Sequence, residues 1–142
     1  MRLDVSPLGK AVLQLEKSLG FLRSELARSN PDLREQFRAA SIQAFGFVYE
    51  LAVKMVRRQM EQIVATPSEL REMNFMDLVR RAADAGLVRD ANSWRQYREL
   101  RNRTSHTYDE EEAEAIVKEL DAFLQDARFT TVELQRRNDA DY

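Results

Sequence analysis

The spacing of apolar residues near the start of this chain restricts it to a helical fold. Six of them follow one another at intervals of 4, 3, 4, 3 and 4: Leu8, Val12, Leu15, Leu19, Leu22 and Leu26. This spacing lines one face of an α-helix, whereas a half-buried strand would need strict alternation. Ser6 is predicted to cap this helix with Pro7 at its first position, and Asn30-Pro31 marks the next boundary.

A second, longer helix is predicted over residues 33–63. Its apolar residues cover more than a narrow stripe: Phe37, Ala44, Phe45, Phe47, Val48, Leu51, Ala52, Met55 and Ile63. A helix with so wide an apolar surface requires neighbours on more than one side. We therefore expect this helix to lie in the core and to supply a face for a dimer. Thr66-Pro67 is predicted to end it.

Three further helices are predicted in the rest of the chain. The first covers residues 75–85, with Asn74 as its cap and Gly86 as its C-terminal stop. The second is capped by Asp90 and carries Trp94, Tyr97 and Leu100 as packing residues. The third opens on the acidic residues 109–112, which favour the positive end of a helix, and its inner face is apolar.

Few residues in this sequence break helices, since 142 residues include four glycines and three prolines. We predict an all-α fold: an antiparallel helical bundle with a four-helix-bundle core and an extra short helix. Residues 1–142 are expected to form a single domain, in which residues 136–142 are a frayed tail.

The composition excludes several classes of function. The chain has no cysteine and one histidine, which excludes disulfides, thiolate metal sites and His-rich metal sites within one chain. A net charge of −2 provides no general attraction to nucleic acid or membranes. No apolar run approaches the roughly 20 residues of a membrane helix, and the N-terminus lacks the pattern of a signal peptide. We expect a cytoplasmic protein without membrane contact, metal or cofactor.

The single histidine lies in the stretch RNRTSHTY, residues 101–108. If a helix continues to Tyr108, Arg101 and Tyr108 lie about 20° apart on one face. Asn102 and His106 would then form an i,i+4 pair within hydrogen-bond reach. The surrounding residues give a local charge of +3 and predict an anion-binding patch: Arg89, Arg95, Arg98, Arg101 and Arg103 against Asp90 and Glu99.

These residue types suit the cleavage of RNA without a metal ion. Histidine can act as base or acid near neutral pH, and arginine can bind a phosphate through two parallel hydrogen bonds. One histidine cannot easily supply both proton transfers, so the chemistry predicts a symmetric dimer whose two motifs face each other. The spacing alone is weak evidence, however. A solvated imidazole at a helix end and a tyrosine at the edge of the core are the simpler interpretations of His106 and Tyr108.

The sequence RNRTSHTYDEE resembles the signature of the HEPN domain, Arg-x4–6-His, in the Arg-Asn-x3-His-x-Tyr form typical of HepT-type proteins. Two more segments resemble the same family in the same order. IQAFGFVYELAVK (42–54) is similar to its second-helix pattern, and RAADAGLVRDANSW (81–94) to the segment before its motif helix. The resemblance covers roughly residues 37–125.

This resemblance implies a dimeric HEPN-like bundle that acts as the toxin of a type VII toxin–antitoxin system. Such a toxin is a metal-independent endoribonuclease with a composite cleft between two subunits. A minimal nucleotidyltransferase (MNT) antitoxin, encoded beside it, would silence it by transferring AMP to Tyr108. Carried over to this sequence, Arg101 and His106 are catalytic and Asn102 orients them. The neighbouring RNA-phosphate contacts would come from Arg98, Arg103 and Ser105.

Two positions depart from the family pattern. Gly46 replaces a glutamate and Val53 replaces a tryptophan. A glycine inside a helix costs about 1 kcal/mol relative to alanine, so we expect another group to pack closely against Gly46. Two other functions also fit the sequence. The protein could be a non-catalytic subunit that binds a nucleotide or substrate for a minimal nucleotidyltransferase, or a structural dimer with a degenerate site.

Overall fold

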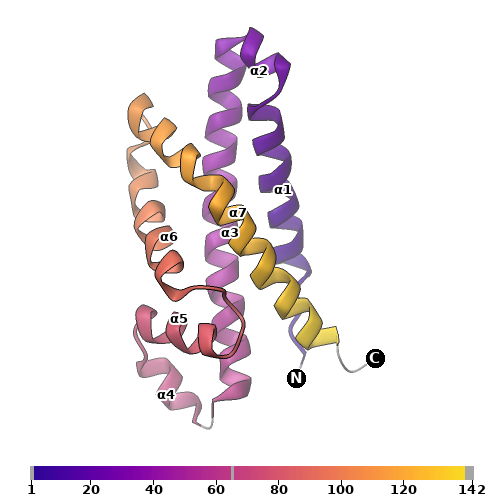
Figure 1. Cartoon of the computed structure of the whole chain (residues 1–142), viewed down its shortest axis with the longest axis vertical. Helices are drawn as coiled ribbons and strands as arrows, with labels where there is room; N and C mark the ends of the chain where they lie inside the picture. Colours follow the sequence, from indigo (N-terminus) through magenta and orange to yellow (C-terminus); the bar gives the residue numbers. More distant parts are fainter. Residues whose placement is uncertain (1, 65, 140–142) are drawn as a thin grey trace.

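The computed structural model describes residues 2–64 and 66–139, and confirms an all-α fold for this part of the chain (Figure 1). It contains seven α-helices and one 3-10 helix: α1 (Ser6–Leu22), α2 (Glu25–Ser29), α3 (Pro31–Ile63), α4 (Pro67–Glu72), α5 (Phe75–Asp84), α6 (Ala91–Arg103), η1 (Thr104–His106) and α7 (Glu110–Asp139). The five predicted helices are all present, and α2 and α4 are additional ones.

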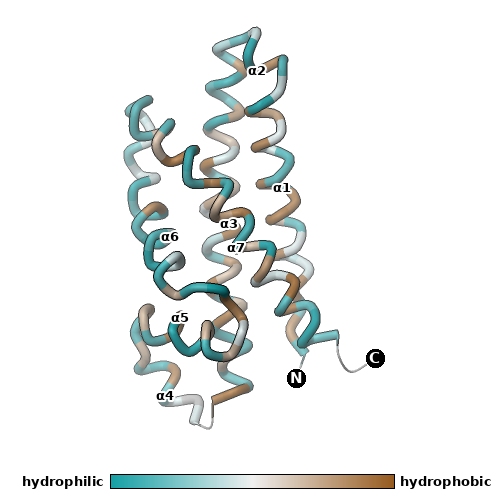
Figure 2. The backbone as a smooth tube through the Cα atoms, viewed as in Figure 1, coloured by the Kyte–Doolittle hydropathy of each residue, from teal (hydrophilic) through white to brown (hydrophobic). Residues whose placement is uncertain are grey.

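The four longest helices form an antiparallel bundle (Figure 1). Helices α1 and α3 lie side by side, α6 runs beside α3, and α7 crosses obliquely over both α3 and α1. Hydrophobic residues recur along α1 and α3 between hydrophilic ones, as the helical spacing requires (Figure 2). In the centre of the bundle, the Phe123 ring lies 4.7 Å from Phe45, 5.0 Å from Tyr97 and 5.8 Å from Trp94, measured between ring centroids.

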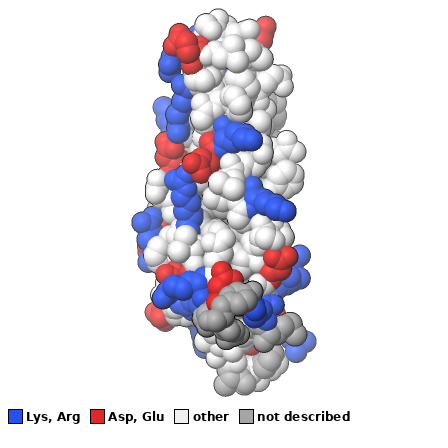
Figure 3. All heavy atoms as spheres, turned by 90° about the vertical axis from the view of Figure 1, so that its right-hand side faces the viewer, with Lys and Arg blue, Asp and Glu red and all other residues white. Residues whose placement is uncertain are grey.

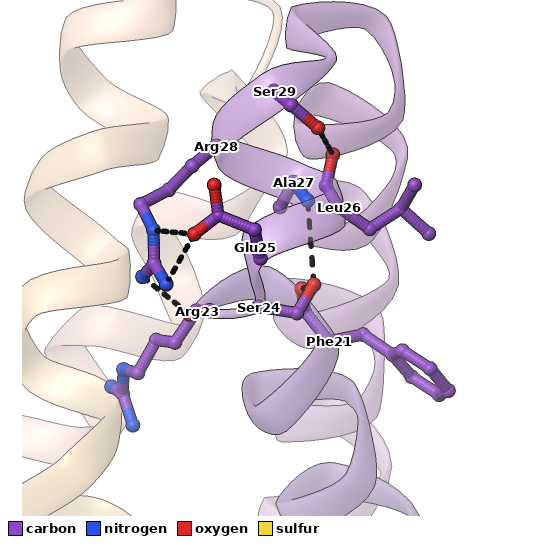
Figure 4. Close-up of polar contacts among 8 residues, drawn as sticks. All are labelled: Phe21, Arg23, Ser24, Glu25, Leu26, Ala27, Arg28 and Ser29. Atoms are coloured by element: carbon purple, nitrogen blue, oxygen red, sulfur yellow. Dashed lines mark hydrogen bonds and ion pairs between the residues drawn. The ribbon is translucent and has the colours of Figure 1, made fainter.

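The first helix differs from its prediction at both ends. Val5 occupies the capping position and Ser6 is already helical; Asp4 accepts hydrogen bonds from the backbone nitrogen of Ser6 at 3.0 Å and from its hydroxyl at 2.6 Å. The helix stops at Leu22, because Ser24 starts α2 by accepting a hydrogen bond from the backbone nitrogen of Ala27 (Figure 4). Leu26 therefore leaves the apolar stripe and is 52% exposed.

Helix α3 packs most of its wide apolar surface inside the chain. By length and composition it contains a segment that could cross a membrane, but half of that segment is buried among the other helices, which accounts for its apolar character. In the described structure, its exposed large apolar residues are Phe47 and Ile63. Much of its apolar surface thus packs against neighbouring helices of the same chain, and the dimer face expected on this helix stays a prediction.

A largely uncharged surface lies beside α1 and α2. Leu13 and Phe21 are exposed on α1, and the Phe21 ring stacks on Phe37 of α3 with 5.4 Å between centroids. Phe21 and Leu26 point to the same side at the junction of α1 and α2 (Figure 4). In the view onto the side of the molecule where α1 lies, the upper part is largely uncharged (Figure 3).

A network around Asp126 fixes α6 against α7. The buried carboxylate accepts a hydrogen bond from the Tyr97 hydroxyl and two from Arg89, at 2.8 and 2.6 Å. Burial, together with the hydrogen bond to Asp126, raises the pKa of Tyr97 above its ordinary value, so this phenol remains a donor. The network holds the helix that leads into the RNRTSHTY motif.

Replacing Asp126 with Ala should lower the free energy of unfolding by about 2–3 kcal/mol, because the buried Tyr97 hydroxyl and Arg89 would both lose their partner. Asp121→Ala on the same helix is the matched control: its pair with Arg23 is exposed on both sides and should contribute less than about 1 kcal/mol. Chemical denaturation of both variants measures the difference. Equal losses would show that the network does not hold α6 and α7 together.

The C-terminal part of the chain is more ordered than predicted. Helix α7 continues to Asp139, so residues 136–139 are helical rather than frayed; residues 140–142 lie outside the described structure. The reason is Asn138, which is buried. Its side-chain nitrogen donates to Gln59 at 2.9 Å, and its side-chain oxygen accepts from the backbone of Leu3 at 2.8 Å.

The departure at Val53 coincides with a packing defect. Val53 borders an apolar cavity of about 10 Å³ whose other walls are Val56, Leu78, Val79, Val88 and Trp94. The indole nitrogen of Trp94 is buried and makes no hydrogen bond in the structure. The side chain of Val53 thus borders a small void against the core tryptophan.

Candidate functional site

The motif does not continue as one helix to Tyr108. Helix α6 ends at Arg103, and residues 104–106 form a single 3-10 turn before α7 begins at Glu110. The turn is stabilised by Thr104, whose hydroxyl donates to the backbone oxygen of Arg101 at 2.7 Å. The face that Arg101 and Tyr108 would share on a continuous helix is therefore not formed.

Arg101 points toward α3, and three groups contact it, two on α3 and one in the 3-10 turn. Its Nη2 donates to Oε1 of Glu50 at 2.6 Å and its Nη1 donates to Oγ1 of Thr104 at 3.0 Å. The third group is Gly46, against which the guanidinium lies. The Arg101 side chain stays 36% exposed, and Glu50 60%. An ion pair this exposed is worth at most about 1 kcal/mol, so an incoming anion can compete for the guanidinium.

Gly46 provides the space in which Arg101 lies. A Cβ atom at position 46 would be 3.2 Å from the Nε of Arg101, and that nitrogen is buried without a hydrogen-bond partner in the structure. The expectation that a group packs closely against this glycine is confirmed, and the group is the motif arginine. The absence of a side chain thus allows the guanidinium to rest directly on the backbone of α3.

A groove of about 440 Å³ extends from Arg101 along α3. Eight residues of α3 line it (Glu35, Arg38, Ala39, Ile42, Gln43, Gly46, Phe47 and Glu50), and the opposite side comes from Arg101, Thr104, Thr107 and Ala113. Its volume falls within the range of small-molecule sites. The wall formed by Ala39, Ile42 and Phe47 is apolar.

Carboxylates and buried groups surround this groove. Glu114 of α7 accepts hydrogen bonds from Arg34 and from Arg38, the latter at 3.1 Å, and the hydrogen bond from Arg34 is the main reason why the pKa of Glu114 is lowered. Arg38 is buried, and the carboxylate of Glu114 pairs with its guanidinium. Next to Glu50, burial raises the pKa of Tyr49 to about 12, so the Tyr49 phenol stays protonated at neutral pH.

His106 and Tyr108 lie outside the groove lining. Both are exposed, Tyr108 to 85%, and their rings are in edge-to-face contact at 6.2 Å between centroids. Tyr108 is therefore not a residue of the core edge. Asn102 is also exposed, and no hydrogen bond connects its side chain with His106 in the described part of the chain. Ser105 donates to the backbone oxygen of Asn102 at 3.3 Å.

The predicted anion patch is largely paired within the chain. Carboxylates contact four of its five arginines: Arg89 (Asp126), Arg95 (Glu99), Arg101 (Glu50) and Arg103 (Glu112). Arg98 lies with its guanidinium carbon 4.8 Å from the centroid of the Phe75 ring. The Arg89–Asp126 pair belongs to the buried network, and the other three pairs are more exposed, so the surface near the motif is not a field of free positive charge.

The sequence analysis missed Glu50, Thr104 and Phe47, which surround Arg101 or line its groove. The signal that pointed to them was Gly46, because Glu50 lies one helical turn after it and Phe47 directly follows it. In residues 2–64 and 66–139, no group of three or more His, Cys, Asp or Glu side chains could hold a metal ion.

Comparison with known proteins agrees with this description. Residues 3–136 match the family described as nucleotidyltransferase substrate binding protein like. A probable ribonuclease HepT from Haemophilus influenzae is 42% identical over 103 residues, which cover 72% of this chain and 70% of that protein.

The structural comparison extends over nearly the whole chain. HI0074 from Haemophilus influenzae, described as having the fold of a substrate binding domain of a nucleotidyltransferase, superimposes with a TM-score of 0.87 at 33% identity. The match covers 93% of this chain and 99% of that one. The resemblance to HepT-type proteins is thereby confirmed. The chain belongs to the nucleotidyltransferase substrate binding protein like family and is a homologue of the probable ribonuclease HepT.

Proposed function

We propose that this protein is a metal-independent endoribonuclease, the HepT-type toxin of a type VII toxin–antitoxin system that acts in the cytoplasm. The observation that carries the proposal is the position of Arg101. Glu50 and Thr104 hold its guanidinium at the groove. Arg101 lies three positions before Thr104, the first residue of the 3-10 turn that ends at His106. Cleavage of RNA by the purified protein in EDTA tests it.

The reaction requires a base, an acid and a cation. The base removes the proton of a ribose 2′-hydroxyl, the 2′-oxygen attacks the adjacent phosphorus, and the bond from phosphorus to the 5′-oxygen breaks. The acid then protonates the 5′-oxygen, which leaves a 2′,3′-cyclic phosphate and a 5′-hydroxyl. Arg101 stabilises the negative charge that develops on the phosphate, and His106 transfers protons.

A dimer supplies the second proton-transfer group. Each chain has one histidine, and no hydrogen bond joins Arg101 to His106 in the described part of one chain. Two motifs that face each other would provide two arginines and two histidines in a single composite cleft. The exposure of His106 and Tyr108 fits side chains that point into such a shared cleft.

Tyr108 is the proposed site of silencing by an MNT antitoxin. Its hydroxyl is accessible because the side chain is 85% exposed, and an adenylate there would add negative charge and bulk next to His106.

Tyr108→Phe should cleave RNA at close to the rate of the wild type but resist the antitoxin, because the acceptor oxygen is gone. Both proteins are incubated with the cognate nucleotidyltransferase and ATP, then assayed for cleavage and intact mass. Glu110→Gln, at an exposed residue two positions away that does not line the groove, should still be silenced. If the antitoxin neutralised the phenylalanine variant and the wild type equally, the tyrosine would not be the switch.

Gly46→Ala should separate stability from activity. Alanine raises the helix propensity of α3, so the protein should be more stable by up to about 1 kcal/mol. The new Cβ would displace the end of Arg101, and cleavage should fall roughly ten-fold because small errors of position are costly in catalysis.

Gly20→Ala is the matched control, since a Cβ there meets no atom within 4 Å. It should stabilise α1 and leave cleavage unchanged; a Gly46 variant with full activity would contradict the role of this glycine.

A second function is favoured by the descriptions of the family and of HI0074, which both refer to substrate binding for a nucleotidyltransferase. In that case the groove beside Arg101 would bind a nucleotide without cleaving RNA. Binding of an MNT protein together with no cleavage of any of several RNAs would support this alternative.

A further inference from the structure

We propose that the groove along α3 binds the nucleoside next to the scissile phosphate, and that Phe47 is the surface on which its base stacks. This inference rests on the proposed function, because Arg101 places the phosphate. It assigns a binding role to residues of α3 that lie outside the RNRTSHTY motif.

The distribution of charge limits what the groove can hold. A polyanion that followed the groove would meet the carboxylates of Glu35 and Glu50, and the buried Arg38 is already neutralised by Glu114. Arg101 is therefore the lining cation that remains partly exposed. One phosphate fits at Arg101, and an uncharged, amphipathic group fits beyond it.

The shape and lining of the groove fit a nucleobase. Phe47 presents an aromatic ring that is 57% exposed, and Ile42 and Ala39 are further apolar residues of the groove lining. Gln43, Thr104 and Thr107 supply hydrogen-bonding groups around this apolar wall. An exposed aromatic ring with polar groups around it is the usual arrangement for binding an unpaired base of single-stranded RNA.

The position of Phe47 relative to Arg101 is also suitable. Gly46, which contacts the guanidinium, immediately precedes Phe47 on the same rigid helix. Phe47 and Arg101 also line the same groove, so a base on Phe47 and a phosphate on Arg101 would lie in one continuous site. Because α3 is fixed by α1 and α7, the backbone that carries the ring is held in place before RNA binds, which lowers the entropic cost of stacking.

The test measures binding and cleavage separately. The probe is a fluorescent 12-nucleotide RNA with 2′-O-methyl groups, which cannot be cleaved because it lacks the attacking hydroxyl. Binding to the full chain is followed by anisotropy in EDTA, and light scattering reports the oligomeric state. The variants are Phe47→Ala, which removes the ring, Phe47→Tyr, which keeps it, and Ala39→Trp, which fills the groove without changing Phe47. Leu13→Ala, at an exposed apolar residue of α1, is the control.

Phe47→Ala and Ala39→Trp should each weaken binding roughly ten-fold, whereas Phe47→Tyr and Leu13→Ala should bind like the wild type. Binding by Phe47→Ala equal to that of the wild type would overturn the inference. A change of oligomeric state in Phe47→Ala would also overturn it, and would assign Phe47 to a contact between subunits. If the wild type binds the probe through Phe47 but cleaves no RNA, the proposed ribonuclease fails while the base site stands.

Discussion

His106→Ala is expected to reduce cleavage of RNA in EDTA by about 10²–10⁴-fold, the usual contribution of a general acid or base. The chain offers no second histidine that could take over. His106 is exposed at the end of a short 3-10 turn and makes no side-chain hydrogen bond in the described structure, so the variant should fold like the wild type. Intact mass must first show that Tyr108 carries no adenylate in either protein.

Ser105→Ala is the control for this experiment. Ser105 lies in the same turn, and its hydroxyl makes one hydrogen bond at 3.3 Å to the backbone of Asn102, so its removal should change cleavage little. Cleavage by His106→Ala at the rate of the wild type would show that the histidine is not catalytic. If neither protein cleaves any of several RNAs, the substrate-binding function becomes the better description.

Arg101→Ala should reduce both the affinity for RNA and the rate of cleavage, the rate by about 10²–10³-fold, because a donor to the transition-state charge is lost. The loss of the guanidinium also leaves the carboxylate of Glu50 unpaired at the groove, where it would repel the phosphate. Arg101→Lys should recover part of the affinity and little of the rate, since lysine keeps the charge without the two parallel donors.

Arg103→Ala is the matched control for the arginine experiment. Arg103 lies on the same last turn of α6, is exposed, and pairs with Glu112 rather than facing the groove. It should lower RNA affinity slightly and leave the cleavage rate intact. Unchanged RNA affinity in Arg101→Ala would contradict the phosphate-binding role. If Arg101→Ala and Arg103→Ala lowered RNA affinity and cleavage rate equally, Arg101 would contribute only a positive charge and not a specific phosphate contact.

The helical spacing of apolar residues made most of the fold predictable. The clearest examples are the core residues Leu8, Leu15 and Leu19, which are all at most 2% exposed. The predicted helix caps Asn74 and Asp90 also accept hydrogen bonds from backbone nitrogens, as expected. Gly86 has the positive φ of 81° that a helix stop favours. These features depend on residues that are close in the sequence, and so a local pattern is sufficient to reveal them.

The errors arose where distant parts of the chain meet and, in one case, at a local helix cap. The tail was predicted to fray, but Asn138 is held by Gln59 and by the backbone of Leu3. Helix α1 was predicted to include Leu26, but Ser24 interrupts it to begin α2. The wide apolar surface of α3 correctly placed this helix in the core, where α1 and α7 pack against it, and the dimer face that it also indicated stays a prediction.

The candidate site shows the same contrast between what the local sequence determines and what tertiary packing determines. The sequence by itself determined which residues are available for chemistry, because one histidine and the Arg-Asn-x3-His-x-Tyr pattern leave few candidates. The tertiary structure decided where they point. A helix that ends at Arg103 turns His106 and Tyr108 outward, while Arg101 reaches across to Gly46 and Glu50. The contact between Arg101 and Glu50 joins residues 51 positions apart, and only the packing of α6 against α3 brings them together.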